Sequence, residues 1–144
     1  MFKRVFLIPL FLVAIITGCR KDAPTATTGV PNVTVNTSID VDNGFYPALQ
    51  NVGGWEYISG GYGGILVLCY SPGNYYAFDM GCPYDCETNS KAIIQVQPGN
   101  ITAKCPVCGT TYNLYGGTVT KGPGSIALKQ YQANFQDPYI YITN

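Results

Sequence analysis

Four cysteines lie in two short segments of this chain and carry its clearest chemical signal. The first segment, residues 82–86, reads CPYDC, and the second, residues 105–109, reads CPVCG. In such a loop proline stiffens the turn, glycine after the second cysteine permits a positive φ angle, and backbone N–H groups can turn toward the thiolates. Two loops of this kind can together enclose a tetrahedral metal ion or an iron–sulfur cluster.

We therefore predict a metal site with the ligands Cys82, Cys86, Cys105 and Cys108. The spacings C-x3-C and C-x2-C suit a Zn²⁺ ion or a single iron nearly as well as a cluster. A third alternative is that these cysteines form disulfides and bind no metal, because oxidising compartments favour disulfides over free thiols. Cys69 stands inside an apolar run, and we interpret it as a small buried hydrophobic residue.

The composition excludes many kinds of catalysis. The 144 residues include eight basic residues, eight acidic residues and no histidine. Without histidine the chain has no Ser-His-Asp triad, no HExxH zinc-protease site and no imidazole acid or base. A net charge of zero argues against a nucleic-acid binder, which needs a basic face. We interpret Asp79, Asp85 and Glu87, which stand near the cysteine segments, as solvated or capping residues.

The elements that position the two loops are predicted to be antiparallel strands. Six consecutive apolar residues, 65–70, predict a strand buried on both faces, and residues 75–78 return as its partner. The glycine-rich residues 60–64 predict a hairpin connection, since no P-loop lysine or helical pattern follows them. The twelve tyrosines fit β pairing and require no sugar-binding site, although exposed ones could serve one. Further strands are predicted around residues 33–41, 55–58, 92–97, 101–104, 110–114, 118–120, 126–131 and 139–142.

The N-terminal residues predict export. Residues 1–18 carry the basic residues Lys3 and Arg4 near their start, followed by a short apolar run. This pattern is typical of a signal peptide. The sequence Ile16-Thr17-Gly18-Cys19 resembles the lipobox of bacterial lipoproteins, which implies a lipid on Cys19 and anchoring to a bacterial cell membrane. Residues 19–32 would then form the anchor and a flexible tether, and residues 33–144 the globular domain.

Two motifs around the cysteines resemble the Rieske iron–sulfur domain, and the resemblance extends over residues 33–144. They read YAFDxGCP at residues 76–83 and CPxCGTxY at residues 105–112. The resemblance implies an all-β fold in which an antiparallel sandwich or barrel base carries a small two-loop subdomain at about residues 80–115. In the family, two cysteines and two histidines of these loops hold a [2Fe–2S] cluster.

This chain departs from the family at both histidine positions. Cys82 and Cys105 match the family cysteines, whereas Tyr84 and Cys108 stand where the histidines would be. Cys86 could complete a set of four sulfurs, and Tyr84 is expected to pack or form a hydrogen bond near the loop. The disulfide that joins the loops in some Rieske proteins does not transfer, because Cys86 is one residue short of its first position and Val107 stands at its second.

The Rieske resemblance implies a carrier of single electrons that works with a redox partner protein, and the predicted lipid on Cys19 would anchor this carrier to the membrane. Four thiolates place more negative charge on the iron than two imidazoles do, so we expect a potential near roughly −400 mV. The alternative is a degenerate Rieske fold with structural zinc or disulfides, which acts as a binding or scaffold module. Catalysis is not expected, because the chain is too short to include the catalytic half of an oxygenase.

Overall fold

The computed structural model describes residues 29–144, so the predicted signal peptide and Cys19 lie outside the described residues. Among residues 29–144 no helix is long and apolar enough to span a membrane. The described elements are strands joined by turns, with one short 3-10 helix. In chain order they are β1 (Asn36–Asp40), the 3-10 helix η1 (Pro47–Gln50), β2 (Trp55–Ile58), β3 (Ile65–Ser71), β4 (Asn74–Asp79), β5 (Gln95–Val96), β6 (Thr102–Lys104), β7 (Thr111–Asn113), β8 (Val119–Lys121), β9 (Gln130–Gln136) and β10 (Tyr139–Thr143).

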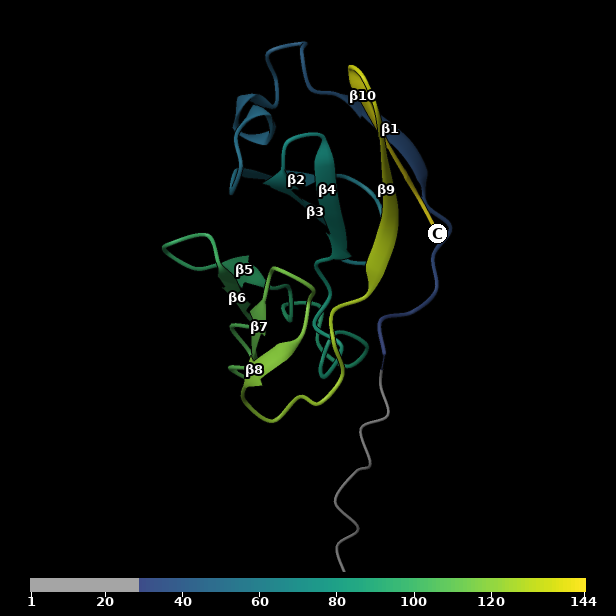
Figure 1. The fold of residues 1–144 in the computed structure, drawn as a ribbon. Helices are drawn as coiled ribbons and strands as arrows, with labels where there is room; N and C mark the ends of the chain where they lie inside the picture. The colour runs from purple at the N-terminus through teal and green to yellow at the C-terminus, as the bar shows by residue number, and fades with distance from the viewer. Residues whose placement is uncertain (1–28) are drawn as a thin grey trace, which may run out of the picture.

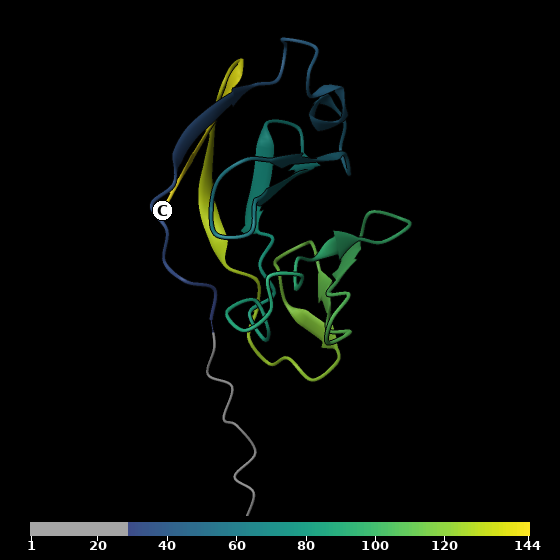
Figure 2. The same cartoon turned by 180° about the vertical axis from the view of Figure 1, so that it is seen from behind.

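The strands form two antiparallel sheets. The larger sheet has the order β1-β10-β9-β4-β3-β2, and the smaller sheet has the order β5-β6-β7-β8. Figure 1 shows the smaller sheet below the larger one, with the chain passing from β4 into the small sheet and returning into β9. The reverse view in Figure 2 shows the same separation between base and subdomain. The predicted all-β, antiparallel class with a base and a smaller loop-bearing part is confirmed.

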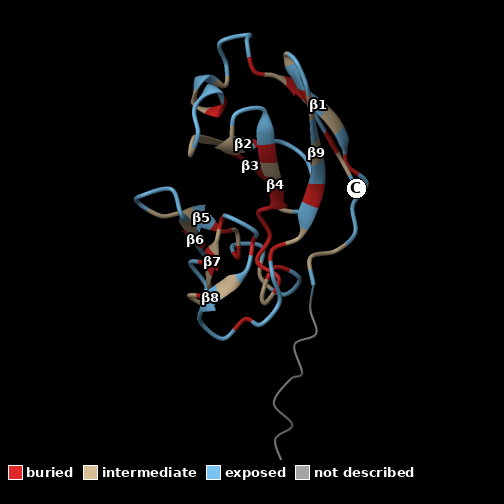
Figure 3. Cartoon of the chain, in the orientation of Figure 1, coloured by how far each residue is buried: buried red, intermediate tan, exposed pale blue. Residues whose placement is uncertain are grey.

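The apolar run at residues 65–70 is buried because the two faces of β3 belong to different cores. Ile65, Val67 and Cys69 belong to the first core, and Leu66 and Leu68, which point to the other face, belong to the second core. The predicted burial on both faces is therefore confirmed, and so is the burial of Cys69, which is 2% exposed. Figure 3 shows the buried segments concentrated along β4 and in the chain that leaves it.

The first core lies against one face of the large sheet. The second core lies against the other face, between the large sheet and the small one. The first core consists of Val35, Ile39, Val41, Leu49, Ile58, Ile65, Val67, Cys69, Tyr75, Ala77, Tyr131, Ile140 and Ile142. The second core consists of Leu66, Leu68, Phe78, Met80, Cys82, Ala92, Ile94, Ala103, Cys105, Tyr112, Leu114 and Leu128. Two cysteines of the predicted site are therefore part of an apolar core.

One predicted strand is displaced along the chain. The apolar pattern predicted a strand at residues 126–131, but β9 begins at Gln130 and continues to Gln136. Residues 126–129 contain Leu128, whose N–H donates to the carbonyl oxygen of Gly117 instead of joining a strand. The second half of β9 has alternating polar residues because one face is exposed, and so the apolar pattern did not reveal it.

Candidate metal centre

The first cysteine loop is closed at its base by backbone hydrogen bonds. The N–H of Cys82 donates to the carbonyl oxygen of Ala92 at 2.8 Å, and the N–H of Ile94 donates to that of Met80 at 2.8 Å. Beyond the base the chain turns tightly, since the N–H groups of Asp85 and Cys86 both donate to the carbonyl oxygen of Cys82. Cys82 is therefore fixed at the root of the loop, while Asp85 and Cys86 lie in the turn.

The second loop connects β6 to β7 and has the form that its sequence predicts. The N–H of Cys105 donates to the carbonyl oxygen of Thr110 at 2.9 Å, and the N–H of Gly109 donates to that of Cys105 at 3.0 Å. Gly109 has a φ angle of 77°, as predicted for the glycine after the second cysteine. Cys105 is fully buried and Cys108 is partly exposed at the loop tip.

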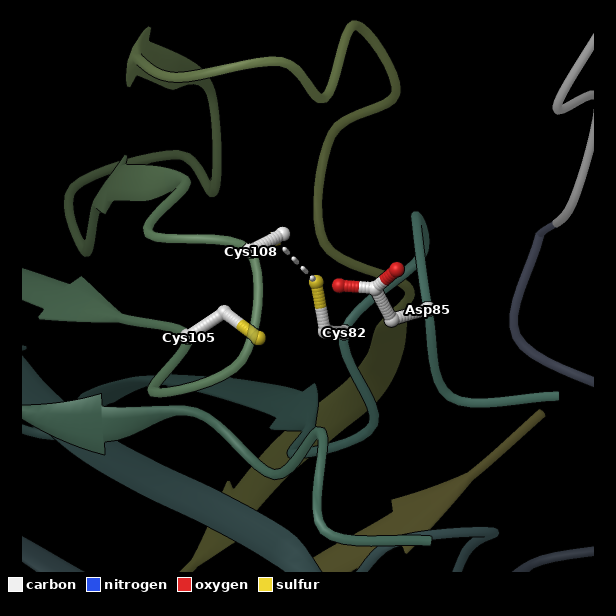
Figure 4. A group of neighbouring side chains, drawn as sticks. All are labelled: Cys82, Asp85, Cys105 and Cys108. Atoms are coloured by element: carbon white, nitrogen blue, oxygen red, sulfur yellow. Dashed lines mark hydrogen bonds between the residues drawn. The ribbon is translucent and has the colours of Figure 1, made fainter. Parts of the chain in front are cut away.

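The two loops bring four potential ligands together (Figure 4). Cys82, Asp85, Cys105 and Cys108 each contribute one atom, and these atoms all lie within 4.8 Å of one another. The sulfurs of Cys82 and Cys108 are 3.7 Å apart although the residues are 26 positions apart in sequence. All five cysteines in residues 29–144 are free thiols in this structure. Three of the four predicted cysteine ligands are thus neighbours in space.

Cys86 and Tyr84 are placed differently from these three cysteines. Cys86 is 1% exposed and is not a member of the four-residue group. Its carbonyl oxygen accepts a hydrogen bond from the Tyr62 hydroxyl at 3.1 Å, and burial beside Cys82 raises the pKa of its thiol to about 11. Its role as a ligand stays a prediction. Tyr84 packs against the second core, in keeping with its expected packing role.

Asp85 is a functional candidate that the sequence reasoning missed. We interpreted it as solvated or capping, but its Oδ2 atom is buried and has no hydrogen-bond partner among the described residues. A buried carboxylate oxygen without a partner is unfavourable by roughly 1–3 kcal/mol, and a bound cation would satisfy it. The signal was present in the sequence, because CPYD at residues 82–85 has the same spacing as CPVC at residues 105–108.

Burial keeps the thiols of Cys105 and Cys108 protonated in the absence of a cation, because it raises the pKa of both. Burial is the main cause that raises the pKa of Cys108 to about 12, although its bonds to Thr110 oppose the shift. Burial also raises the pKa of Cys105. The Cys82 sulfur lies 3.3 Å from the Tyr112 hydroxyl, whose pKa is likewise raised by burial. A transition-metal ion would reverse this preference, because it binds the thiolate and releases the proton.

The four atoms match the dimensions of a site for one ion. With metal–sulfur bonds of about 2.3 Å and tetrahedral angles, thiolate sulfurs lie about 3.8 Å apart. The observed 3.7 Å between Cys82 and Cys108 agrees with this value. A [2Fe–2S] cluster needs two ligand pairs held apart by two irons and their bridging sulfides, and a fourth thiolate besides. As arranged, the group has the dimensions for a single ion, and the [2Fe–2S] cluster that the sequence resemblance implies stays a prediction.

The comparisons with known proteins include a weak likeness to a solved structure. No family model matches this chain, and no curated protein matches its sequence. Among solved structures, a chain from a complex of reduced oxygenase and oxidized ferredoxin in carbazole 1,9a-dioxygenase is similar, with a TM-score of 0.47 and 14% sequence identity. The match covers 78% of this chain and 94% of that chain. A likeness of this size does not show a family.

Asp79 fixes the first loop to the large sheet. It is fully buried, and its two carboxylate oxygens accept four hydrogen bonds. Three come from the backbone N–H groups of Tyr62, Gly63 and Gly81, and the fourth comes from the Tyr131 hydroxyl at 2.6 Å. It is thus a capping residue, as one of our two interpretations had it, but it is not solvated. Because Gly81 precedes Cys82, this carboxylate orients the root of the loop.

Proposed function

We propose that this chain is a metal–thiolate protein whose two loops hold one iron ion for single-electron transfer. The observation that carries the proposal is the group formed by Cys82, Asp85, Cys105 and Cys108, whose ligand atoms lie within 4.8 Å of one another. Thiolates select Zn²⁺, iron or Cu(I) over Mg²⁺ and Ca²⁺. When bound, iron supplies a one-electron couple, and the chain's own residues determine its environment.

Iron is favoured over structural zinc because the fold has little need of a metal to hold it together. Structural zinc sites replace a hydrophobic core in small domains that cannot form one. Here Cys82 and Cys105 are themselves fully buried in the second core, which includes large apolar side chains such as Phe78, Leu114 and Ile94. A metal in this site is therefore expected to serve chemistry more than stability.

The surroundings of the group suit an outer-sphere electron carrier. Cys82 and Cys105 are buried, so water does not reach the metal site from the protein interior. Cys108 is partly exposed at the tip of the second loop. Next to it Val107 is 43% exposed and offers an apolar contact for a redox partner protein. Two surface cavities lie away from this group, one between β4 and β9 and one where the two ends of the domain meet. No substrate is needed for the proposed role.

A second candidate is electron transfer by a [2Fe–2S] cluster with Cys86 as the fourth thiolate. Two features favour it, namely the resemblance of both loop motifs to the Rieske domain and the burial of Cys86 one turn after Cys82. This arrangement would require Cys86 to replace Asp85 in the group. The two candidates differ in iron content, labile sulfide and ligand set.

Metal analysis of the full chain, purified without reducing agents or chelators, separates the candidates. We expect one iron per chain, no acid-labile sulfide and the visible absorption of iron–thiolate bonds. Two irons with two sulfides would identify the second candidate. One zinc in a colourless sample would keep the metal site but contradict electron transfer. A metal-free chain with its cysteines in disulfides would contradict both candidates.

Variants test the ligand set directly. Asp85→Asn should weaken iron binding at least tenfold, Cys105→Ala should abolish it, and Cys86→Ser and Tyr84→Phe should leave it unchanged. The exposed Glu87, two residues after Asp85, provides a matched control as Glu87→Gln. Loss of iron in Cys86→Ser with retention in Asp85→Asn would reverse our assignment of the fourth ligand.

We also propose that the protein is exported and held on a bacterial membrane by lipid at Cys19. The support is the sequence Ile16-Thr17-Gly18-Cys19 at the end of an apolar run. Labelled fatty acid should be incorporated into the wild-type chain and not into Cys19→Ser, which should leave the membrane fraction. Equal labelling of both proteins would contradict the anchor.

A further inference from the structure

A groove of about 400 Å³ opens on the face of the large sheet that points away from the first core, between β4 and β9. Its volume is within the range of about 300–1,000 Å³ found for small-molecule sites. Strands β4 and β9 pair at Ala77 with Tyr131 and at Phe78 with Gln130. The groove lies next to these pairs, along the neighbouring residues of both strands. The residues that line the groove include Tyr70, Tyr76 and three polar residues of β9.

Two tyrosines form a fixed aromatic platform in this groove. The rings of Tyr70 and Tyr76 stack with their centroids 4.2 Å apart and an interplanar angle of 24°. Tyr70 lies between Cys69 and Ser71, where the regular register of the β3–β4 pairing shifts. Tyr76 also stacks on the buried Phe78, with centroids 5.6 Å apart, and both tyrosines keep part of their surface exposed.

Three amide side chains line the groove beside the platform. Gln130, Gln132 and Asn134 alternate along β9, so they share one face of the sheet, and all three are exposed. Their amide groups form no hydrogen bond with other residues in the described part of the chain. Each amide has two N–H donors and a carbonyl acceptor, which suits ligands that carry many hydroxyl groups.

The groove carries no charge. None of its lining residues is acidic or basic. Lys129, which precedes Gln130, has its ammonium 5.5 Å from the ring centroid of the lining residue Tyr131. This ammonium already donates to the carbonyl oxygen of Pro31 and to the side chain of Asn32, at 3.0 and 2.9 Å. The lining residues themselves therefore offer an anionic ligand no charged partner. An apolar protein segment would leave the three amides without partners, which is unfavourable.

We infer that this groove binds an uncharged polysaccharide. A sugar ring has an apolar C–H face, which packs on an aromatic ring, and a rim of hydroxyl groups, which exchange hydrogen bonds with amides. The Tyr70–Tyr76 platform and the row of Gln130, Gln132 and Asn134 provide both features side by side. The inference does not depend on the metal centre, whose residues are on the two loops.

Titration calorimetry of the full chain, in a detergent that contains no sugar, tests this inference. The probes are hydroxyethyl cellulose, galactomannan, dextran and pullulan, with polygalacturonate as the anionic comparison. We expect binding of at least one neutral polymer and none of polygalacturonate. Absence of binding to all four neutral polymers, or binding of polygalacturonate alone, would overturn the inference.

Variants connect the binding to the groove. Tyr70→Ala and Gln132→Ala should each weaken binding of the neutral polymer at least tenfold, and Gln132 is exposed, so its replacement leaves the fold intact. Tyr115→Ala and Gln95→Ala replace exposed residues of the same types outside the groove and should bind like wild type. Unchanged binding in both groove variants, or equal losses in the control variants, would place the ligand elsewhere and reject the groove. Iron content should be the same in all four variants.

Discussion

At the scale of single residues, Asp79 and Tyr131 show how a buried polar pair connects the large sheet to the metal-binding loop. The four hydrogen bonds of Asp79 compensate for removing a carboxylate from water. Gly61 is required beside the pair, because a Cβ atom there would lie 2.5 Å from the Asp79 Oδ2 atom. The pair therefore fixes the positions of residues 61–63 and of the chain that leads into Cys82.

Replacement of Asp79 by asparagine should destabilise the protein strongly. In Asp79→Asn one acceptor oxygen becomes an NH₂ group that faces N–H or O–H donors. We expect a loss of about 3 kcal/mol in the free energy of unfolding, measured by urea denaturation, together with weaker iron binding. The exposed Glu87→Gln is the control. A loss below about 1 kcal/mol would mean that the network contributes little.

Tyr131 makes stability sensitive to alkaline pH. Burial, followed by the hydrogen bond to Asp79, raises its pKa above the ordinary value of 10.0. In the unfolded chain the phenol releases its proton near pH 10, whereas in the folded protein it keeps the proton to higher pH. The free energy of unfolding should therefore be unaffected below about pH 9 and fall as the pH rises above about 10.

Urea unfolding between pH 8 and pH 11 measures this dependence. Tyr131→Phe should reduce the alkaline fall without removing it, because the pKa of the buried Tyr112 is raised as well. The exposed Tyr141→Phe should behave like wild type. An identical alkaline slope in wild type and Tyr131→Phe would contradict the prediction.

At the scale of elements, the second cysteine loop is supported from behind by the chain after β8. The N–H of Gly124 donates to the Thr110 hydroxyl oxygen at 3.0 Å, and the Cys108 thiol donates to the same oxygen at 3.1 Å. Gly122 packs closely against the backbone of Thr110. A Cβ atom at position 122 would lie 2.5 Å from the Thr110 Cα atom. The segment 122–124 thus determines where the Cys108 sulfur lies.

Gly122→Ala should displace this support. Gly122 and Gly116 have similar φ angles of 109° and 114°, but a Cβ atom at Gly116 meets nothing within 4 Å. Gly116→Ala is therefore a control for backbone strain, which is about 1 kcal/mol. We expect Gly122→Ala to be less stable than Gly116→Ala and to bind iron at least tenfold more weakly, measured by calorimetric unfolding and metal titration. Equal behaviour of the two variants would show that the contact has no effect on the site.

At the scale of the whole molecule, two cores share the strands β3 and β4. The first core is within the large sheet, and the second core extends from the large sheet to both cysteine loops. The small sheet alone would expose its apolar face, so it depends on the base for burial. Base and subdomain should therefore unfold together in one transition.

Removal of the metal should leave the fold intact. After treatment with a chelator under reducing conditions, we expect an unchanged far-ultraviolet circular dichroism spectrum and a midpoint of thermal unfolding lower by only a few degrees. The reason is that Cys82 and Cys105 remain packed among the apolar residues of the second core. Loss of β structure on chelation would instead indicate a structural metal site of the zinc type.

Local sequence signals were sufficient to predict the all-β class, most of the strands and the two cysteine loops. Residues 55–58 and 65–70 were predicted as strands, and β2 and β3 occupy these positions. Alternation, apolar runs and turn residues act within a few residues, so they can be recognised without the partner strand. The paired CPYD and CPVC spacings also stand in the sequence, although we overlooked the first.

The partners of buried polar groups and the shape of the surface were decided only by the tertiary structure. Asp79 and Tyr131 are 52 positions apart, and Cys82 and Cys108 are 26 apart, so each contact depends on how distant strands pair and pack. The turn after Cys82 brings Asp85 and not Cys86 into the ligand group. The stacking of Tyr70 on Tyr76 likewise depends on the pairing of β3 with β4. Residue types therefore determined which chemistry the chain can perform, and long-range packing determined which residues meet to perform it.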